Sequence, residues 1–488
     1  MENVQADLKK IVFENYQKFP DKTNFVPFFE KDKPVIYFAD NDGFKKALFF
    51  VKMVGIEAEI EETDRKKILE ILEAVSGDMN IDVDTERMDE SESVEDILSA
   101  TYQDAPIISL VNQIIVNAVK SDASDIHFEN LDDFFIVRYR IDGSLRTVRK
   151  FKKGIHSQII ARLKVMAMLD VSETRKPQDG RINIKVGNRE VDMRVSTVPS
   201  TKGEKVVLRV LEKTKGLIRL DNLGLPVGFA DKYKSYIKKP NGIILVTGPT
   251  GSGKTTTLYA SLLELDREVK NIVTIEDPVE YQIEKITQVQ VNPVVNLTFA
   301  SAIKSFLRQD PDVILVGEIR DEETAKAAVQ ASLTGHLVLS TLHTNDAPTA
   351  IARLIDMGVE PFLVASSLML VAGQRLVRKV CDNCKTEKII DDSERKMFGS
   401  TNFDIEKYFI GNGCEKCMFT GYKGRAAIFE FLEINDEIRK LITSKSSSKD
   451  IEKEARKIGY KSLVEEGLRL VKEGKTTLQE VVSVTMVE

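Results

Sequence analysis

The chain has 488 residues, of which 42% are hydrophobic and 30% charged, and its net charge at pH 7 is −6. This length predicts two to four domains, at about 150 residues per domain. The acidic balance disfavours a nucleic-acid-binding protein, whose surface carries a basic patch. No apolar run reaches the ~20 residues that span a bilayer, and residues 1–7 lack the basic and apolar regions of a signal peptide. We therefore expect a cytoplasmic protein that meets a membrane only through a partner or an amphipathic surface.

Residues 1–72 have the pattern of a small α/β module. The apolar run at 34–39 predicts a strand, and residues 42–54 carry apolar side chains at helical spacing. Residues 56–60 predict a second strand, and residues 65–75 a second helix. No catalytic constellation is visible, so a docking or spacer domain is favoured over a second active site.

A strongly acidic segment follows at residues 73–104. Between residues 73 and 96 it carries ten acidic side chains and a single basic one, Arg87. High charge with few large apolar groups is typical of a flexible linker. Such a linker would let the first module swing relative to the rest of the chain.

Residues 105–219 are expected to form a second α/β domain, PAS-like and rich in antiparallel strands. An apolar helix is predicted at 107–119. Asp142-Gly143 and Gly187-Asn188 are turn signals between strands. The predicted strands are 125–129, 135–141, 182–186, 191–196 and 206–211.

Residues 220–488 are expected to form a RecA-like domain. Short apolar strands alternate with helices, which predicts a mainly parallel sheet covered on both faces. The predicted strands are 243–247, 272–276, 313–317 and 337–341. The stretch from 451 to 484 is mostly helical and shows no further site.

A phosphate-binding loop follows the first of these strands. Its glycines let backbone N–H groups turn inward around a polyphosphate. Lys254 reaches the β- and γ-phosphates, and the Thr255 hydroxyl holds Mg²⁺. The helix that begins here adds its partial positive charge. We expect ATP to bind at Gly248, Pro249, Thr250, Gly251, Ser252, Gly253, Lys254, Thr255 and Thr256; the alternative is a chance glycine-rich turn.

Carboxylates end two other strands of this domain. Glu318 follows the strand at 313–317, at the edge where α/β sheets bind ligands, and is placed to orient and deprotonate the attacking water. Glu276, Asp277 and Glu280 end the strand at 272–276 and are candidate Mg²⁺ or water ligands. The alternatives are a solvated strand-end glutamate and, for Asp277-Pro278, a simple turn.

Two of the four histidines of the chain lie around the strand at 337–341. His343 follows the strand, and we expect it to sense the γ-phosphate or to link the site to a neighbouring element. His336 begins the strand, so a structural role is favoured for it.

All four cysteines fall in two C-x-x-C pairs that are separated by 29 residues. This spacing can place four thiolates tetrahedrally around Zn²⁺, with no position left for a substrate water. We therefore expect a structural zinc site within about residues 378–424, rather than free or redox thiols. Its ligands would be Cys381, Cys384, Cys414 and Cys417.

These motifs together resemble the secretion ATPase superfamily. The phosphate loop is similar to its Walker A box, residues 274–281 to its Asp box, residues 308–321 to its Walker B box and residues 334–346 to its His box. The most similar members are the type II secretion ATPases (general secretory pathway protein E) and the type IV pilus extension ATPases. The resemblance extends through the second domain, and it is loose over residues 1–72.

The resemblance implies a homo-hexameric ATPase, peripheral at the inner membrane, that assembles pilin-like fibres. Arginines of the second domain would approach the nucleotide, and Arg194 and Arg209 are the best candidates; without the resemblance, both read as surface salt-bridge residues. The implied partners are an inner-membrane platform protein and a docking protein at the cytoplasmic face, with no direct contact to nucleic acid. The zinc element and the long N-terminal region, which retraction ATPases lack, argue against pilus retraction.

Three alternatives remain open. Type II secretion, type IV pilus extension and assembly of a DNA-uptake pseudopilus share one motor, and the sequence does not separate them. A DNA-translocating ATPase predicts a basic channel, which the acidic balance disfavours. A nucleotide-gated scaffold without hydrolysis is disfavoured by the presence of both Lys254 and Glu318.

Overall fold

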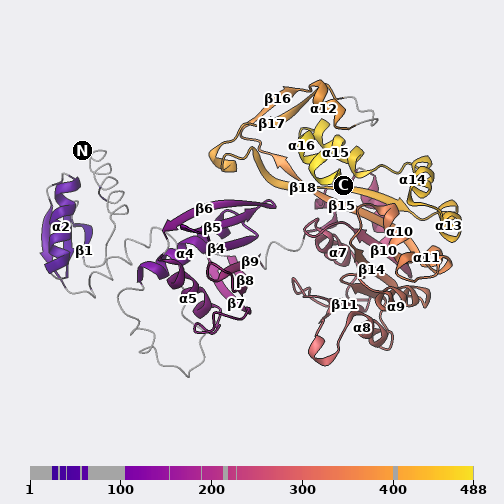
Figure 1. The fold of residues 1–488 in the computed structure, drawn as a ribbon, viewed down its shortest axis with the longest axis horizontal. Helices are drawn as coiled ribbons and strands as arrows, with labels where there is room; N and C mark the ends of the chain where they lie inside the picture. The colour runs from indigo at the N-terminus through magenta and orange to yellow at the C-terminus, as the bar shows by residue number, and fades with distance from the viewer. Residues whose placement is uncertain are drawn as a thin grey trace. The chain divides into compact units, whose positions relative to one another are not determined.

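A computed structural model describes residues 12, 25–30, 33–39, 41–54, 56, 58–63, 67, 105–152, 154–187, 189–212, 218–226, 228–398 and 405–486 (Figure 1). The chain divides into two compact units. One comprises residues 1–100 with 185–189, and the other residues 101–184 with 190–488. The fold is mixed α/β, as the sequence predicts.

The first unit holds a three-stranded sheet. β1 (Phe25–Glu30) pairs antiparallel with β2 (Lys33–Phe38), and β2 pairs parallel with β3 (Glu59–Glu62). The parallel pair needs a crossover connection, and α2 (Asn41–Val54) provides it. Apolar residues of both elements, including the fully buried Ile36 and Phe50, form the core.

The expectations for this unit are partly confirmed. The strand at 34–39 and the helix at 42–54 are present, but β3 begins at Glu59 rather than at residue 56. The sequence pattern does not predict β1, because Pro27 interrupts its apolar run and a proline argues against a strand. The expected helix at 65–75, Lys67 excepted, and the acidic linker at 73–104 lie outside the described residues.

The second unit begins with an antiparallel sheet in the order β6-β5-β4-β9-β8-β7. Its strands are β4 (Asp125–Asn130), β5 (Phe134–Ile141), β6 (Ser144–Lys152), β7 (Gln178–Val186), β8 (Arg189–Val198) and β9 (Lys205–Glu212). Two helices, α4 (Ala105–Lys120) and α5 (His156–Met166), pack against each other beside the sheet. The sequence misses β6 and α5: β6 is rich in basic residues, and α5 buries only a narrow stripe that includes Ile159 and Leu163.

A seven-stranded sheet in the order β12-β11-β13-β14-β10-β15-β18 forms the centre of the remaining chain. All pairs are parallel except β15 with β18. The strands are β10 (Gly242–Thr247), β11 (Ile272–Glu276), β12 (Thr287–Gln290), β13 (Val313–Val316), β14 (Leu337–Leu342), β15 (Leu368–Val380) and β18 (Tyr422–Glu433). Every residue of β10, β11, β13 and β14 is buried, which explains their continuous apolar runs.

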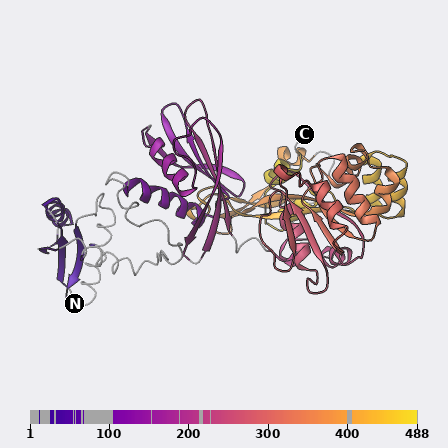
Figure 2. The ribbon, with the colours of Figure 1, turned by 90° about the horizontal axis from the view of Figure 1, so that it is seen from below.

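Helices cover both faces of this sheet (Figure 2). One face packs mainly on α8–α11, α13 and α14, and the other on α6 and α7, each through its own apolar core. The mainly parallel, doubly covered sheet predicted from the sequence is confirmed. The helices are α6 (Phe229–Ile237), α7 (Lys254–Leu263), α8 (Phe299–Phe306), α9 (Glu322–Leu333), α10 (Ala347–Asp356), α11 (Pro361–Ser367), α13 (Asp436–Thr443), α14 (Ser448–Lys457), α15 (Leu463–Lys472) and α16 (Leu478–Thr485).

The cysteine element is inserted between β15 and β18. It consists of the antiparallel pair β16 (Lys385–Ile389) and β17 (Lys407–Gly411), the short helix α12 (Asp392–Lys396), and a turn at Glu415–Cys417. Its apolar side chains share a core with α15 and α16. The C-terminal helices therefore support this element.

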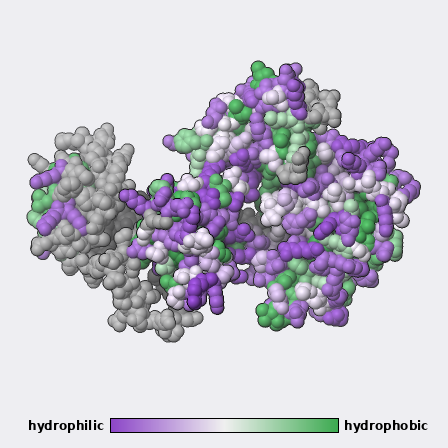
Figure 3. Space-filling model, in the orientation of Figure 1, coloured by the Kyte–Doolittle hydropathy of each residue, from purple (hydrophilic) through white to green (hydrophobic). Residues whose placement is uncertain are grey.

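The surface in Figure 3 mixes hydrophilic and hydrophobic residues over the described parts. Over those parts, no helix combines the length and the apolar character needed to cross a bilayer.

Leu339 tests the role of the buried sheet. It lies on the central strand β14, is 0% exposed, and belongs to the core on the α6–α7 face. Leu339→Ala should lower the free energy of unfolding by about 2–5 kcal/mol, because it leaves a cavity in a close-packed core. Urea unfolding followed by circular dichroism measures the change. Leu333→Ala, at a 40% exposed position of α9, is the control, and equal losses in both variants would contradict this packing.

Candidate functional site

The phosphate loop joins the end of β10 to the start of α7 at the carboxyl edge of the sheet. Gly251 and Gly253 have positive φ, of 80° and 88°, which explains glycine at both positions. A Cβ at Gly253 would lie 2.9 Å from the Gln374 amide nitrogen on β15. Gln374 also accepts a hydrogen bond from the Thr257 hydroxyl at 2.8 Å, so β15 supports the loop from behind.

Lys254, the first residue of α7, folds back onto the phosphate loop. Its Nζ donates hydrogen bonds to the Gly248 and Pro249 carbonyl oxygens, at 2.8 and 2.9 Å. Burial lowers the pKa of Lys254 to about 8; the nearby Glu318 carboxylate opposes this shift, and Arg375 adds to it. The next residue, Thr255, is exposed in the first turn of the helix.

Glu318 lies two residues beyond the end of β13, and its side chain is 13% exposed. Its Oε2 lies 2.5 Å from Arg320 Nε and 3.4 Å from His343 Nε2. The structure thus brings the predicted Glu318 and His343 together. Arg320 stands in the same motif, but the sequence pattern predicts no role for it.

His343 follows β14 directly and is 46% exposed. Burial lowers the pKa of its imidazole; Lys254 and Arg320 also lower it, and Glu318 opposes the shift. The shift favours the neutral form of the ring at pH 7. A neutral imidazole can donate one hydrogen bond and accept another.

The three carboxylates at the end of β11 occupy different environments. Glu276 is 3% exposed and accepts hydrogen bonds from Thr274 Oγ1 at 2.6 Å, from Gln288 Nε2 at 3.2 Å and from the Tyr259 hydroxyl. Asp277 is exposed and Glu280 is half-buried. Both Glu276 oxygens are thus occupied by protein donors, whereas Asp277 faces solvent.

The two candidate arginines pair with each other in register on neighbouring strands β8 and β9. Arg194 donates to the Val279 carbonyl at 3.1 Å and lies 3.7 Å from Glu280 Oε2. Arg209 is 63% exposed and lies 3.0 Å from Asp125 Oδ1. Among the described residues, neither guanidinium pairs with the phosphate loop, and Arg194 alone reaches the segment after β11.

The four cysteine sulfurs lie within 4.8 Å of one another. Cys381 to Cys414 is 3.9 Å, Cys384 to Cys417 is 3.8 Å, and Cys414 to Cys417 is 3.7 Å. Zinc bound at 2.3 Å by four tetrahedral sulfurs requires sulfurs about 3.8 Å apart. Backbone N–H groups of Cys414 and Gly421 donate to Cys417 Sγ, and Asn383 donates to Cys414 Sγ. This donor set fits a metal site.

Comparison with known proteins identifies the family. The model described as "Type II/IV secretion system protein" matches residues 100–483. The chain belongs to this family. It is 49% identical over 413 residues to type II secretion system protein HxcR of Pseudomonas aeruginosa, over 84% of each chain. It is 50% identical over 391 residues to type II secretion system ATPase E of Vibrio cholerae, over 80% of this chain and 77% of that one.

Further relatives include a pilus ATPase and solved structures. Type IV pilus assembly ATPase PilB of Thermus thermophilus is 48% identical over 378 residues, which are 77% of this chain and 42% of PilB. The pilus retraction motor PilT with bound ADP aligns with a TM-score of 0.51 and 26% identity, over 76% of this chain and 96% of PilT. The ATPase DotB of Legionella pneumophila, with a TM-score of 0.57 and 20% identity, matches in fold over 78% of this chain and 95% of DotB. This chain is an ATPase of the secretion and pilus assembly family.

The pKa of Lys254 has a measurable consequence for ATP binding. Phosphate oxygens favour the charged amine, so ATP binding should draw a proton onto Lys254 wherever the free amine is partly neutral. With a free pKa of about 8, uptake should rise from about 0.1 proton per site at pH 7 to about 0.8 at pH 8.5. Titration calorimetry of the wild-type protein in buffers of different ionisation enthalpy measures this uptake.

Lys254→Arg is the matched control, since arginine stays protonated throughout this pH range. Its proton uptake at pH 8.5 should be close to zero. The same uptake in both proteins would show that another group titrates.

Proposed function

We propose that this protein hydrolyses ATP at the carboxyl edge of its central sheet, and that the hydrolysis drives assembly of pilin-like fibres and export through an inner-membrane platform. One observation carries the proposal. The phosphate loop with Lys254, the carboxylate of Glu318 and the imidazole of His343 meet at one edge, in a chain about half identical to type II secretion ATPases over most of its length.

The phosphate loop binds the nucleotide. ATP oxygens would replace the Gly248 and Pro249 carbonyls as partners of Lys254, and backbone N–H groups in the first turn of α7 would face the phosphates. Thr255 and Asp277 offer an exposed hydroxyl and an exposed carboxylate, the oxygen ligands that Mg²⁺ prefers. Bound Mg²⁺ neutralises phosphate charge.

Glu318 is the catalytic base. A water oxygen attacks the γ-phosphorus, the bond to the β,γ-bridging oxygen breaks, and the water proton passes to Glu318, so that ADP and inorganic phosphate leave. Both contacts of Glu318 described above use Oε2, so we assign the proton to Oε1. His343 orients the carboxylate and faces the γ-phosphate. Glu276 positions the segment after β11, and Asp277 and Glu280 assist with the metal or the water.

Arg194 and Arg209 complete the site from the second domain. Arginine stabilises charge that develops on a transferred phosphoryl group. Arg194 already touches the segment after β11, which supports its part. Arg209, exposed and paired with Asp125, would exchange this partner for a nucleotide as the second domain closes. We propose that six chains form a ring in which each subunit opens and closes in turn.

The domain division is part of the proposal. Residues 1–72 form a docking module, 73–104 a linker, 105–219 the PAS-like domain and 220–488 the RecA-like ATPase domain. The docking module and the zinc element would contact a cytoplasmic-face docking protein and the inner-membrane platform protein. The protein would thus be cytoplasmic and peripheral at the inner membrane.

Among the three systems, type II secretion has the strongest support. Its ATPases align with this chain over 77% or more of their own length, whereas the alignment with PilB covers 42% of PilB. Pilus extension and DNA-uptake pseudopilus assembly are the alternatives within the same motor class.

Two variants separate hydrolysis from binding. Glu318→Gln should lower kcat by about 10²- to 10⁴-fold, because it removes the general base, and should leave ATP binding intact. Lys254→Ala should abolish binding as well. Steady-state phosphate release and titration with a fluorescent ATP analogue measure the two effects. Glu323→Gln, on the exposed first turn of α9, is the control.

Unchanged turnover in Glu318→Gln would identify another base. Wild-type binding without turnover, even with phospholipid and the platform protein added, would support the scaffold alternative.

The cysteine element should bind one zinc per chain. Cys417→Ser should lose the metal and lower the unfolding temperature, because metal binding at a structural site contributes to folding free energy. Elemental analysis of the purified protein and thermal unfolding measure both. Asp382→Asn, at a 92% exposed side chain inside the first cysteine pair, should retain the metal. Four thiols that react rapidly in a metal-free native protein would contradict the site.

A further inference from the structure

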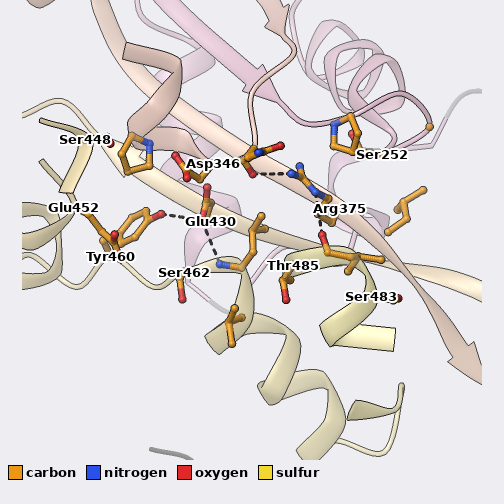
Figure 4. A pocket seen from close by; sticks show the side chains of 18 of the residues that line it. Ser252, Asp346, Arg375, Glu430, Ser448, Glu452, Tyr460, Ser462, Ser483 and Thr485 are labelled. Atoms are coloured by element: carbon orange, nitrogen blue, oxygen red, sulfur yellow. Dashed lines mark hydrogen bonds between the residues drawn. The ribbon is translucent and has the colours of Figure 1, made fainter. Parts of the chain in front are cut away.

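A cavity of about 580 Å³ lies beside the phosphate loop, on the side of the C-terminal helices. Its wall includes Pro249–Ser252, β15, β18 and the first residues of three helices, α10, α14 and α15. Two buried charged groups line it, Arg375 on β15 and Glu430 on β18 (Figure 4). Neither has a part in the mechanism above.

Glu430 is 2% exposed and holds the beginnings of two helices. Its Oε1 accepts a hydrogen bond from the Ala347 N–H at 2.5 Å, and its Oε2 accepts from the Tyr460 hydroxyl at 2.7 Å and the Leu463 N–H at 3.2 Å. Ala347 and Leu463 are the first residues of α10 and α15. First-turn N–H groups have no acceptor within their own helix, so one carboxylate serves both.

On the neighbouring strand β15, a glycine leaves space for the Glu430 carboxylate. Glu430 pairs in register with Gly373 on β15, and a Cβ at Gly373 would overlap Glu430 Oε1. Burial raises the pKa of Glu430 to about 7, although the hydrogen bonds from Tyr460 and Ala347 oppose the shift. Burial of a carboxyl group costs free energy, and the hydrogen bonds that Glu430 accepts offset that cost.

Arg375 holds the backbone on the other side of Asp346. It is 7% exposed, and it donates from Nη2 to the Asn345 carbonyl at 2.7 Å, from Nε to the Val484 carbonyl at 3.2 Å and from Nη1 to the Gln374 carbonyl at 3.1 Å. Figure 4 shows the hydrogen bonds of Arg375 next to those of Glu430. Residues 345 and 347 are therefore each fixed by a buried charge.

The same segment begins at the catalytic edge. The Thr344 N–H donates to Thr247 Oγ1 at 3.2 Å, at the last residue before the phosphate loop. His343, one residue earlier, lies 3.4 Å from Glu318 Oε2. Three anchors, at residues 344, 345 and 347, thus hold the backbone that follows His343, and the adjoining cavity leaves this backbone room to move if one is lost.

We propose that Glu430 and Arg375 are positioning residues of the ATPase site: they fix the backbone from Asn345 to Ala347 and so hold His343 against Glu318. The inference rests on the proposed function. It also connects the catalytic edge to the C-terminal helices, because Leu463 and Val484 belong to α15 and α16.

The test is Glu430→Gln in the full-length protein. The amide has one acceptor oxygen and turns a donor toward groups that themselves donate, so a backbone anchor is lost. We expect kcat to fall about tenfold and the KM for ATP to stay within about twofold, because the contacts of Lys254 and the phosphate loop are untouched. Arg375→Gln should lower kcat in the same way, because it removes the anchor at Asn345.

His343 supplies a readout that does not require turnover. The chain has four histidines, so ¹³C-labelled histidine gives few resonances, and His343→Gln assigns the relevant one. Glu430→Gln should shift the titration of His343 upward toward its ordinary pKa as the ring leaves its partly buried place beside Lys254 and Arg320. The signal of His336, at the other end of β14, serves as the internal reference.

Glu394→Gln is the matched control. Glu394 is also 2% exposed and accepts a tyrosine hydroxyl, from Tyr408 at 2.6 Å, but it lies in the cysteine element. It should change thermal stability without moving His343. If Glu430→Gln is poorly folded, Tyr460→Phe removes a single hydrogen bond to Oε2, and a smaller shift of His343 in the same direction is expected.

Two results would overturn the inference: a His343 titration and kcat in Glu430→Gln equal to those of the wild type, or the same His343 shift in Glu394→Gln. Absence of turnover in the wild type would refute the proposed function instead, and the His343 titration would still decide whether Glu430 positions the segment.

Discussion

The site depends on the parallel, in-register pairing of four buried strands. Thr247 pairs with Leu342, and Ile275 with Val316, so β10, β11, β13 and β14 end at one edge. Residues that follow these ends are brought together although they are distant in sequence. A shift of one residue in any pair would turn its side chains to the opposite face. Because both faces are buried in apolar cores, such a shift is strongly opposed. The positions of the catalytic residues at the strand ends are fixed for the same reason.

The sequence predicts the parts of the site that repeat a local pattern. Apolar runs that end in Gly248, Glu276, Glu318 and His343 locate the strands and their carboxyl ends, and the spacing of the cysteines locates the metal-ligand set. It does not predict the order of the strands, because pairing such as that of β10 between β14 and β15 is decided by tertiary packing. It also fails where a rule of local propensity is overridden, as at Pro27 in β1 and in the basic strand β6.

The sequence also does not predict how side chains are oriented or which distant residues are in contact. Glu276 reads as a free carboxylate at a strand end, yet Tyr259, Thr274 and Gln288 draw it into a buried network. Glu430 lies 83 residues from Ala347 in the chain, and Arg375 lies 109 residues from Val484. No periodicity or motif marks such pairs. Arg320 is the exception, since it stands two residues from Glu318 and its charge is visible in the motif itself.

The cysteine element is a long connection between two strands that pair directly with each other. Antiparallel strands such as β15 and β18 are usually joined by short loops, but here a long insertion leaves after Val380 and returns at Tyr422. The base of the insertion is closed by a hydrogen bond from the Cys381 N–H to the Gly421 carbonyl at 2.8 Å. The four sulfurs meet at this base, so a metal bound to them would close the long loop a second time and offset part of its closure entropy.

The charged groups of the site have partners within the chain. Lys254 donates to two carbonyls of its own loop, and Glu318 pairs with Arg320. ATP binding therefore replaces existing contacts of these side chains and does not neutralise an unpaired charge. The net free energy from each new contact is then smaller than the strength of that contact alone. Selectivity for the triphosphate must then come from groups that engage only when a γ-phosphate is present. We propose this role for His343, whose Nε2 lies 3.4 Å from Glu318 Oε2 and whose pKa is also lowered by the charge of Lys254.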